Sequence, residues 1–188
     1  ADLNISMQFK EDTYIPEGDV AVKISLTGLK GGHSGVDIHL GRANANKLIF
    51  RFLKDAVRDY GARLSVIEGG SLRNAIPREA FAILTIPGDN VEALWEFVSD
   101  YQETFREEYK GIEGNISFVA EMTDMPTTLI PEEIQDDLIN AVEGCQNGVI
   151  SMLVDFPGTV ESSTNLAIVK SSNELIEIQI LVRSSSDS

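Results

Sequence analysis

The fold is decided by residues 20–60, which read VAVKISLTGLKGGHSGVDIHLGRANANKLIFRFLKDAVRDY. Apolar and polar side chains alternate from Val20 to Thr27, with the period of two that is typical of a half-buried strand. After a glycine-rich loop, the apolar residues between positions 43 and 60 recur at helical spacing, and Gly61 can end a helix. The stretch therefore predicts a strand, a loop at the exit of that strand, and a helix.

The same two periods continue further along the chain. They predict strands at 63–67 and 79–86, a helix at 91–109 and a strand at 116–122. The order β-α-β-β-α-β predicts the α+β class, with a ferredoxin-like split βαβ unit over residues 20–123. In such a unit both helices cover one face of a four-stranded antiparallel sheet. The alternating residues 3–9 predict an additional edge strand.

The pattern restarts after Pro126, which divides the chain into halves at 1–125 and 126–188. The second half predicts a helix at 131–146 and strands near 149–154, 162–169 and 174–182. We interpret it as a partial second unit of the same kind, without the final helix and strand. The start and end of the sequence predict that residues 1–188 are a fragment of a longer protein.

Charge and composition exclude several classes of partner. Asp and Glu number 30 against 15 Lys and Arg, and the formal net charge of −15 disfavours binding to nucleic acid or to anionic membranes. The apolar runs are far shorter than the roughly 20 residues of a membrane helix. A lone cysteine, Cys145, excludes an internal disulfide and fits a reducing compartment. We therefore expect a cytoplasmic protein that binds neither nucleic acid nor membrane.

Two polar loops and a strand end are candidates for chemistry. His33 lies between glycines in Gly-Gly-His-Ser-Gly, where the backbone can approach a ligand closely, although a plain surface turn is the alternative. Asn74 precedes Ile-Pro in a second glycine-containing loop, where an Asx turn is the alternative. Arg183 ends an apolar strand, where its guanidinium can bind a carboxylate or simply be solvated.

The chain offers little for a metal or for a nucleophile. It contains only two histidines, and His39 is expected to be structural. Because no His, Asp or Glu residues cluster at metal-ligand spacing, we predict that this chain holds no metal site of its own. Ser34 lies next to His33 but lacks the third partner that an activated serine needs.

Several segments resemble the aminoacyl-histidine dipeptidases, the carnosine-type dipeptidases of the dinuclear-zinc metallopeptidase clan. The resemblance lies in residues 29–35, 44–48 and 70–80, and it extends through residues 147–150 and 181–184. These motifs occur in the order and spacing of the family, so the resemblance covers essentially the whole chain. It implies that the chain is a lid, or substrate-capping, domain.

The resemblance also implies the roles of particular residues. In the family, a separate catalytic domain, absent from this chain, binds two zinc ions and supplies a glutamate as general base, and the lid closes over a dipeptide. His33 would donate to the carbonyl oxygen or oxyanion, and Asn74 and Arg183 would hold the terminal carboxylate of an Xaa-His substrate. Asn165 is a further substrate-binding candidate. Many relatives carry an arginine in the strand after the Asn-x-Ile-Pro turn, but residues 81–86 contain none, so Arg183 would have to serve.

Two alternatives remain open. Lids of this clan often form homodimers, so the chain is also interpreted as a dimerisation or assembly module of a related aminoacylase or peptidase. The motifs do not define the leaving residue, so an aminoacylase or a tripeptidase of the same clan is the other enzymatic interpretation.

Overall fold

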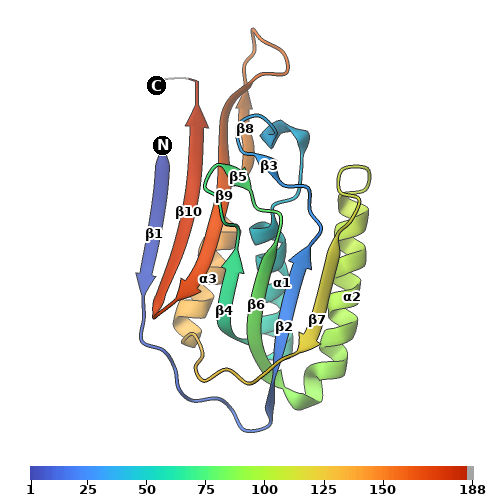
Figure 1. Cartoon of the computed structure of the whole chain (residues 1–188), viewed down its shortest axis with the longest axis vertical. Helices are drawn as coiled ribbons and strands as arrows, with labels where there is room; N and C mark the ends of the chain where they lie inside the picture. Colours follow the sequence, from blue (N-terminus) through green and yellow to red (C-terminus); the bar gives the residue numbers. More distant parts are fainter. Residues whose placement is uncertain (186–188) are drawn as a thin grey trace.

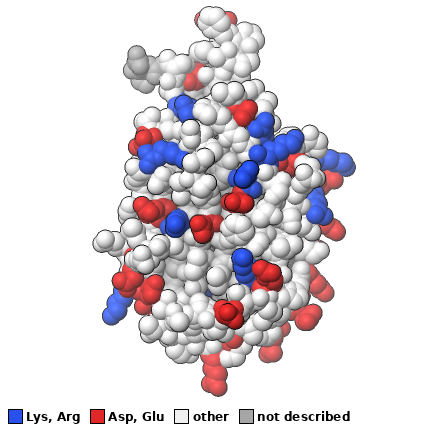
Figure 2. Space-filling model, in the orientation of Figure 1, with Lys and Arg blue, Asp and Glu red and all other residues white. Residues whose placement is uncertain are grey.

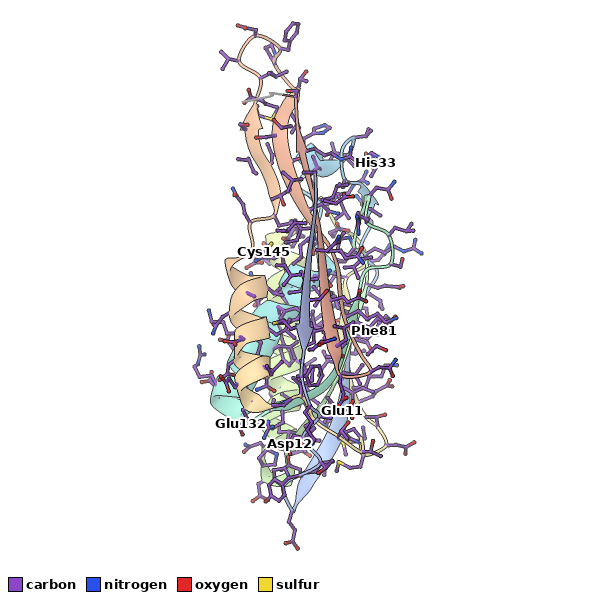
Figure 3. The ribbon with its side chains drawn as sticks, turned by 90° about the vertical axis from the view of Figure 1, so that its left-hand side faces the viewer. Glu11, Asp12, His33, Phe81, Glu132 and Cys145 are labelled. Carbon is purple, nitrogen blue, oxygen red and sulfur yellow. The ribbon has the colours of Figure 1, made fainter. Side chains whose placement is uncertain are left out.

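The computed structural model describes residues 1–185 and places its three α-helices on one face of a large sheet (Figures 1 and 3). The helices are α1 (Ala45–Tyr60), α2 (Val91–Glu108) and α3 (Glu132–Gly144), with 3-10 turns η1 (Ile38–Leu40) and η2 (Gly88–Asn90). The strands are β1 (Asp2–Gln8), β2 (Asp19–Thr27), β3 (Gly32–His33), β4 (Arg63–Gly69), β5 (Ala75–Ile76), β6 (Ala80–Pro87), β7 (Ser117–Met122), β8 (Gly148–Met152), β9 (Val160–Ser172) and β10 (Leu175–Ser184). The predicted α+β class is confirmed.

The main sheet is antiparallel and has the order β1-β10-β9-β4-β6-β2-β7, with β8 paired to the first part of β9. The four strands β4, β6, β2 and β7, together with α1 and α2, form the predicted split βαβ unit (Figure 1). The bounds of both helices agree with the predicted ones to within two residues. The ends of α1 are set by Asn44, whose side chain caps the first turn, and by Gly61, which takes a left-handed conformation after the last turn.

The second half extends this same sheet. The strand β9 joins β4 through the pairs Glu68 with Lys170 and Gly69 with Val169, and β10 then pairs with β1. The helix α3 lies beside α1 on the face that all the helices cover (Figure 1). The second half therefore shares its sheet and its core with the first, and its interpretation as a partial second unit stays a prediction. The last three residues of the predicted half 126–188 lie outside the described residues.

Aromatic side chains fix α1 and α2 beneath the sheet. The ring of Phe52 in α1 lies 5.0 Å from that of Phe118 in β7 and 5.5 Å from that of Tyr101 in α2, between centroids. Burial, and the hydrogen bond that its hydroxyl donates to Asp55, raise the pKa of Tyr101. Through this hydrogen bond the phenol joins the two helices. Within residues 1–185, none of the helices combines the length and the apolar character needed to span a membrane.

Lys47 of α1 caps the last turn of α3. Its Nζ donates to the carbonyl oxygens of Val142 and Glu143, each at 2.8 Å, and of Cys145 at 3.0 Å. The carbonyl oxygen of Val142 also accepts the backbone N–H of Cys145 at 3.3 Å, so Lys47 is a second partner there and the capping donor for Glu143 and Cys145. Because carbonyls at the end of a helix lack the usual partner one turn further on, we expect Lys47→Met to lower the free energy of unfolding by about 1–3 kcal/mol. Denaturant unfolding measures the change, with Lys110→Met at an exposed position as the control. An equal loss in both variants would contradict the capping role.

Candidate active site

The structure brings the His33 loop and the Asn74 loop together. The short strands β3 and β5 pair outside the main sheet, with Gly32 opposite Ile76 and His33 opposite Ala75. The backbone N–H of Ser34 also donates to the carbonyl oxygen of Asn74 at 2.9 Å. Figure 1 places this pair at the upper end of the sheet, and Figure 3 shows His33 beyond the ends of the helices. Two segments that are 40 residues apart in sequence thus form one surface.

The imidazole of His33 has a defined tautomer. Its Nδ1 accepts hydrogen bonds from the backbone N–H groups of Gly35 and Val36, each at 3.1 Å. A ring nitrogen that accepts hydrogen bonds carries no proton, so the proton of the neutral ring is on Nε2. Because the side chain is exposed, the Nε2–H group of His33 can donate a hydrogen bond to a ligand at the surface of the loop.

A small polar network holds the shape of the His33 loop. One carboxylate oxygen of Asp37 accepts the backbone N–H of His33 at 2.9 Å and lies 3.3 Å from Nη1 of Arg42. The same Nη1 donates to the carbonyl oxygen of Gly31 at 2.7 Å. Gly32 has a φ of 139°, and a β-carbon there would lie 2.2 Å from Nη1 of Arg42. Only glycine fits this position, so the loop is preorganised rather than loose.

Arg183 reaches the His33 loop from β10. A β-carbon on Gly35 would lie 3.2 Å from Nε of Arg183 and 3.2 Å from Cε1 of His33. Because Gly35 has no side chain, the guanidinium of Arg183 and the imidazole of His33 can both lie close to its α-carbon. Nε of Arg183 is buried, and within residues 1–185 it has no hydrogen-bond partner. The guanidinium thus keeps one N–H donor without an acceptor beside the His33 loop.

Asn165 lies on β9 and supports the Asn74 loop. Its side-chain Nδ2 donates to the carbonyl oxygens of Ala75 at 2.8 Å and Arg73 at 3.4 Å, the two residues that flank Asn74. The side chain is 1% exposed, and its Oδ1 has no partner in the described part of the chain. The four predicted residues therefore converge, but the amide N–H₂ group of Asn165 is bound to the protein itself. Its predicted contact with substrate stays a prediction.

Arg73 anchors the same loop from the other side, which the sequence did not indicate. Its guanidinium pairs with Asp2 at 2.7 Å and donates to Asn4 at 2.8 Å and to Gln179 at 3.2 Å. These partners lie on β1 and β10. The turn that carries Asn74 is thus attached to β1 and β10 through Arg73. The position of Arg73 within the motif was visible in the sequence, but no local pattern reveals partners so distant along the chain.

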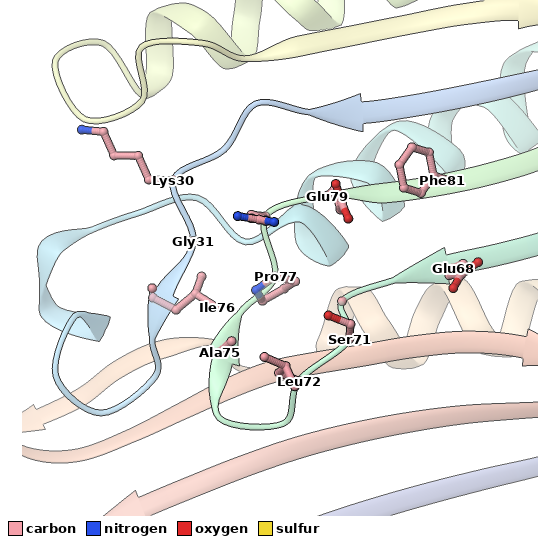
Figure 4. A pocket seen from close by; sticks show the side chains of 13 residues that line it. Lys30, Gly31, Glu68, Ser71, Leu72, Ala75, Ile76, Pro77, Glu79 and Phe81 are labelled. Atoms are coloured by element: carbon pink, nitrogen blue, oxygen red, sulfur yellow. The ribbon is translucent and has the colours of Figure 1, made fainter.

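A groove of about 510 Å³ borders the site (Figure 4). Gly31 and Ile76 line its near end, and Glu68 and Phe81 line its far end on the open face of the sheet. None of the four predicted side chains lines this groove. A ligand held by these four side chains would therefore lie beside the groove and not inside it.

Basic side chains gather near the site although the whole chain is strongly acidic. Figure 2 shows most of the Lys and Arg of one face over its upper half, with Asp and Glu interspersed there, and mainly Asp and Glu along its lower margin. The segments that build the site contribute the following basic residues: Lys30, Arg42, Arg73, Arg78 and Arg183. Arg42 and Arg73 are already paired with Asp37 and Asp2, so Lys30, Arg78 and Arg183 are the basic groups whose charge would act on an approaching anion.

Comparison with known proteins identifies the first half. Residues 24–113 match the family model described as the peptidase dimerisation domain. This part of the chain belongs to that family. The sequence is 38% identical to the cytosol non-specific dipeptidase of Escherichia coli (strain K12) over 174 residues, which are 93% of this chain and 36% of that protein. The crystal structure of aminoacylhistidine dipeptidase from Vibrio alginolyticus matches 99% of this chain and 38% of its own, with a TM-score of 0.95 and 38% identity.

The chain therefore spans less than two-fifths of the length of these two relatives. Among residues 1–185, no three His, Cys, Asp or Glu side chains come together in a group that could hold a metal ion. The donor set of the described residues thus does not fit a dinuclear metal centre. Any metal ions that act together with the site need ligands from outside this set of residues.

Proposed function

We propose that this dimerisation domain is the lid of a metal-dependent dipeptidase that hydrolyses Xaa-His dipeptides. In this proposal the lid closes over a dinuclear zinc centre held by the catalytic domain of a longer polypeptide. The observation that carries the proposal is the pairing of a fixed Nε2–H donor on His33 with the guanidinium of Arg183 around Gly35. The two relatives named as dipeptidases support the reaction class.

His33 donates to the scissile carbonyl oxygen in the proposed reaction. That oxygen gains negative charge when the peptide bond is attacked, so a donor that is already aimed at it interacts most strongly in the transition state. The two backbone N–H groups on Nδ1 keep the proton on Nε2, where donation requires it. The loop pays no reorganisation cost at the moment of reaction because its shape is set in advance.

Asn74 and Arg183 bind the terminal carboxylate of the dipeptide. The exposed amide of Asn74 can donate one hydrogen bond, and the guanidinium can donate two in parallel. Holding the carboxylate fixes the peptide bond relative to His33, which raises the fraction of bound substrate in a reactive orientation. Asn165 acts behind them, since it holds the carbonyl groups on either side of Asn74.

The zinc ions would supply the activated water and part of the charge stabilisation when bound to the catalytic domain. We place the protein in the cytoplasm, in agreement with the name of the Escherichia coli relative and with the single cysteine. Its partners are its own catalytic domain, a dipeptide and a second copy of itself.

Homodimer assembly is a second candidate function that the family description favours. The strand β7 forms one edge of the main sheet, and its side chains Val119 and Met122 are 45% and 55% exposed. An exposed apolar edge strand is suited to pairing with another copy. Assembly and capping are compatible, because β7 forms one edge of the sheet, whereas β10, which carries Arg183, lies next to β1 at the other edge.

The purified chain of residues 1–188 tests both functions. We expect it to hold no stoichiometric zinc by metal analysis and to cleave no Xaa-His dipeptide, because residues 1–185 gather no group of metal ligands and the proposal places the general base in the catalytic domain. Two tightly bound zinc ions per chain, or turnover of a dipeptide, would contradict the assignment of this chain as a lid. Sedimentation equilibrium of the same sample measures its mass, and a dimeric mass would support the assembly role.

A further inference from the structure

Glu113 is a buried acidic residue that contacts both ends of the His33 loop. It follows α2 in a tight turn and is 6% exposed. One carboxylate oxygen accepts the backbone N–H of Lys30 at 2.8 Å, and the other accepts the backbone N–H of Ala43 at 3.1 Å. These two N–H groups bracket the loop that carries His33. A single side chain thus closes the base of that loop.

The chemistry of this contact requires a carboxylate. A buried charge is costly unless hydrogen bonds compensate it, and here each oxygen receives a backbone donor. A glutamine at position 113 could accept only one of the two N–H groups, since its NH₂ group would face the other donor. Substitution by glutamine therefore keeps the size of the side chain and removes half of the clamp.

The turn that carries Glu113 is itself firmly placed. The backbone N–H groups of Ile112 and Glu113 both donate to the carbonyl oxygen of Tyr109 at 2.9 Å. Gly28, at the exit of β2, has a φ of 81°, and a β-carbon there would lie 1.8 Å from the carbonyl oxygen of Asn115. The turn and the start of the His33 loop are therefore in close contact at a second point.

A short chain of contacts connects Glu113 to the imidazole. Lys30 and Ala43 are followed inward along the loop by Gly31 and Arg42, which hydrogen-bond to each other. Arg42 in turn pairs with Asp37, and Asp37 accepts the backbone N–H of His33. A displacement of Lys30 or Ala43 would therefore also displace the backbone of His33.

We propose that Glu113 is a positioning residue that sets the location of the His33 N–H donor. The proposal rests on the proposed function, in which that donor meets charge developing on the scissile oxygen. Glu113 touches neither substrate nor His33 directly; it acts through Lys30, Ala43 and the Arg42–Asp37 pair. An error of about 1 Å in such a group is enough to slow a reaction by up to 10²-fold.

A double-mutant cycle in the full-length dipeptidase tests the assignment. We expect Glu113→Gln to lower kcat by about 10- to 100-fold with little change in KM. In a chain that already carries His33→Ala, we expect Glu113→Gln to lower kcat no further, because the donor that it positions is gone. Glu103→Gln, which removes the same charge from an exposed site on α2, is the matched control and should leave kcat unchanged.

The outcomes separate the inference from the proposed function. If His33→Ala alone reacts at the original rate, the proposed function fails, and the inference fails with it. If His33→Ala is slow but Glu113→Gln is fast, or if the two losses multiply, only the inference fails. If Glu113→Gln does not fold, Arg42→Gln replaces it in the same cycle. The proposal is overturned if the losses of kcat in Arg42→Gln and His33→Ala multiply in the double mutant. Nitrogen-15 NMR of the His33 ring adds a readout apart from activity. Glu113→Gln is expected to shift the ring nitrogen signals, because the loop also places the N–H groups of Gly35 and Val36 on Nδ1, and unaltered signals overturn the proposal.

Discussion

Replacing His33 with alanine in the full-length dipeptidase is expected to lower kcat by about 10²–10³-fold while KM changes little. The reason lies in when the interaction forms. The Nε2–H group meets a nearly neutral carbonyl in the bound substrate and a charged oxygen in the transition state, so its removal weakens the second far more than the first. Steady-state and single-turnover kinetics together measure the loss in the chemical step.

The second histidine of the chain provides the control for this experiment. His39 is exposed in η1, and His39→Ala should leave kcat unaltered. Circular dichroism verifies that both variants fold. A His33→Ala enzyme with near-normal turnover would remove the imidazole from the reaction, and an equal loss in His39→Ala would attribute the effect to the loop as a whole.

Replacing Arg183 with alanine is expected to raise KM by about 10- to 100-fold, because a hydrogen bond to a charged group contributes roughly 1.5–3 kcal/mol. The contact with the terminal carboxylate exists before the reaction begins, so its loss first weakens binding of the substrate. Arg183→Lys retains the charge but not the paired N–H groups, and we expect an intermediate KM. Kinetics with an Xaa-His dipeptide measure these differences.

A modified substrate shows whether the carboxylate is the group that Arg183 binds. A dipeptide with a terminal amide lacks the charge, so the original enzyme and Arg183→Ala should cleave it with similar kcat/KM. Arg58→Ala, near the exposed end of α1, is the control and should behave as the unaltered enzyme with both substrates. If Arg183→Ala loses as much activity toward the amide as toward the acid, the carboxylate assignment is wrong.

The sequence predicted the regular elements well because their signals are local. The alternation from Val20 to Thr27 corresponds to β2, and Asn44 and Gly61 mark the ends of α1. The boundary between β9 and β10 was less accurate. The predicted strand began at Glu174, but Asn173 and Glu174 have φ values of 52° and 59° and form the turn between the two strands. Neither residue is glycine, so the usual sequence signal for such a turn was missing.

The candidate site was predictable in its parts but not in its assembly. The resemblance selected His33, Asn74, Asn165 and Arg183, and the structure brings them together. The two-residue pairing of β3 with β5 is too short to give any periodic pattern. The contacts of Glu113 depend on hydrogen bonds between groups 70 and 83 residues apart, and no spacing rule registers such distances.

The pairing of β1 with β10 has a consequence for how the molecule reaches its native state. Asp2 pairs with Leu181, so one edge of the sheet joins the two ends of the described chain. At ordinary rates of protein synthesis, β1 waits on the order of ten to thirty seconds before its partner has been made. During that interval Leu3, Ile5 and Met7 have no neighbouring strand to pair with, whereas the β2-α1-β4-β6 segment can already fold through closer contacts. The pairing of β1 with β10 is therefore expected to be among the last steps in the folding of the described residues.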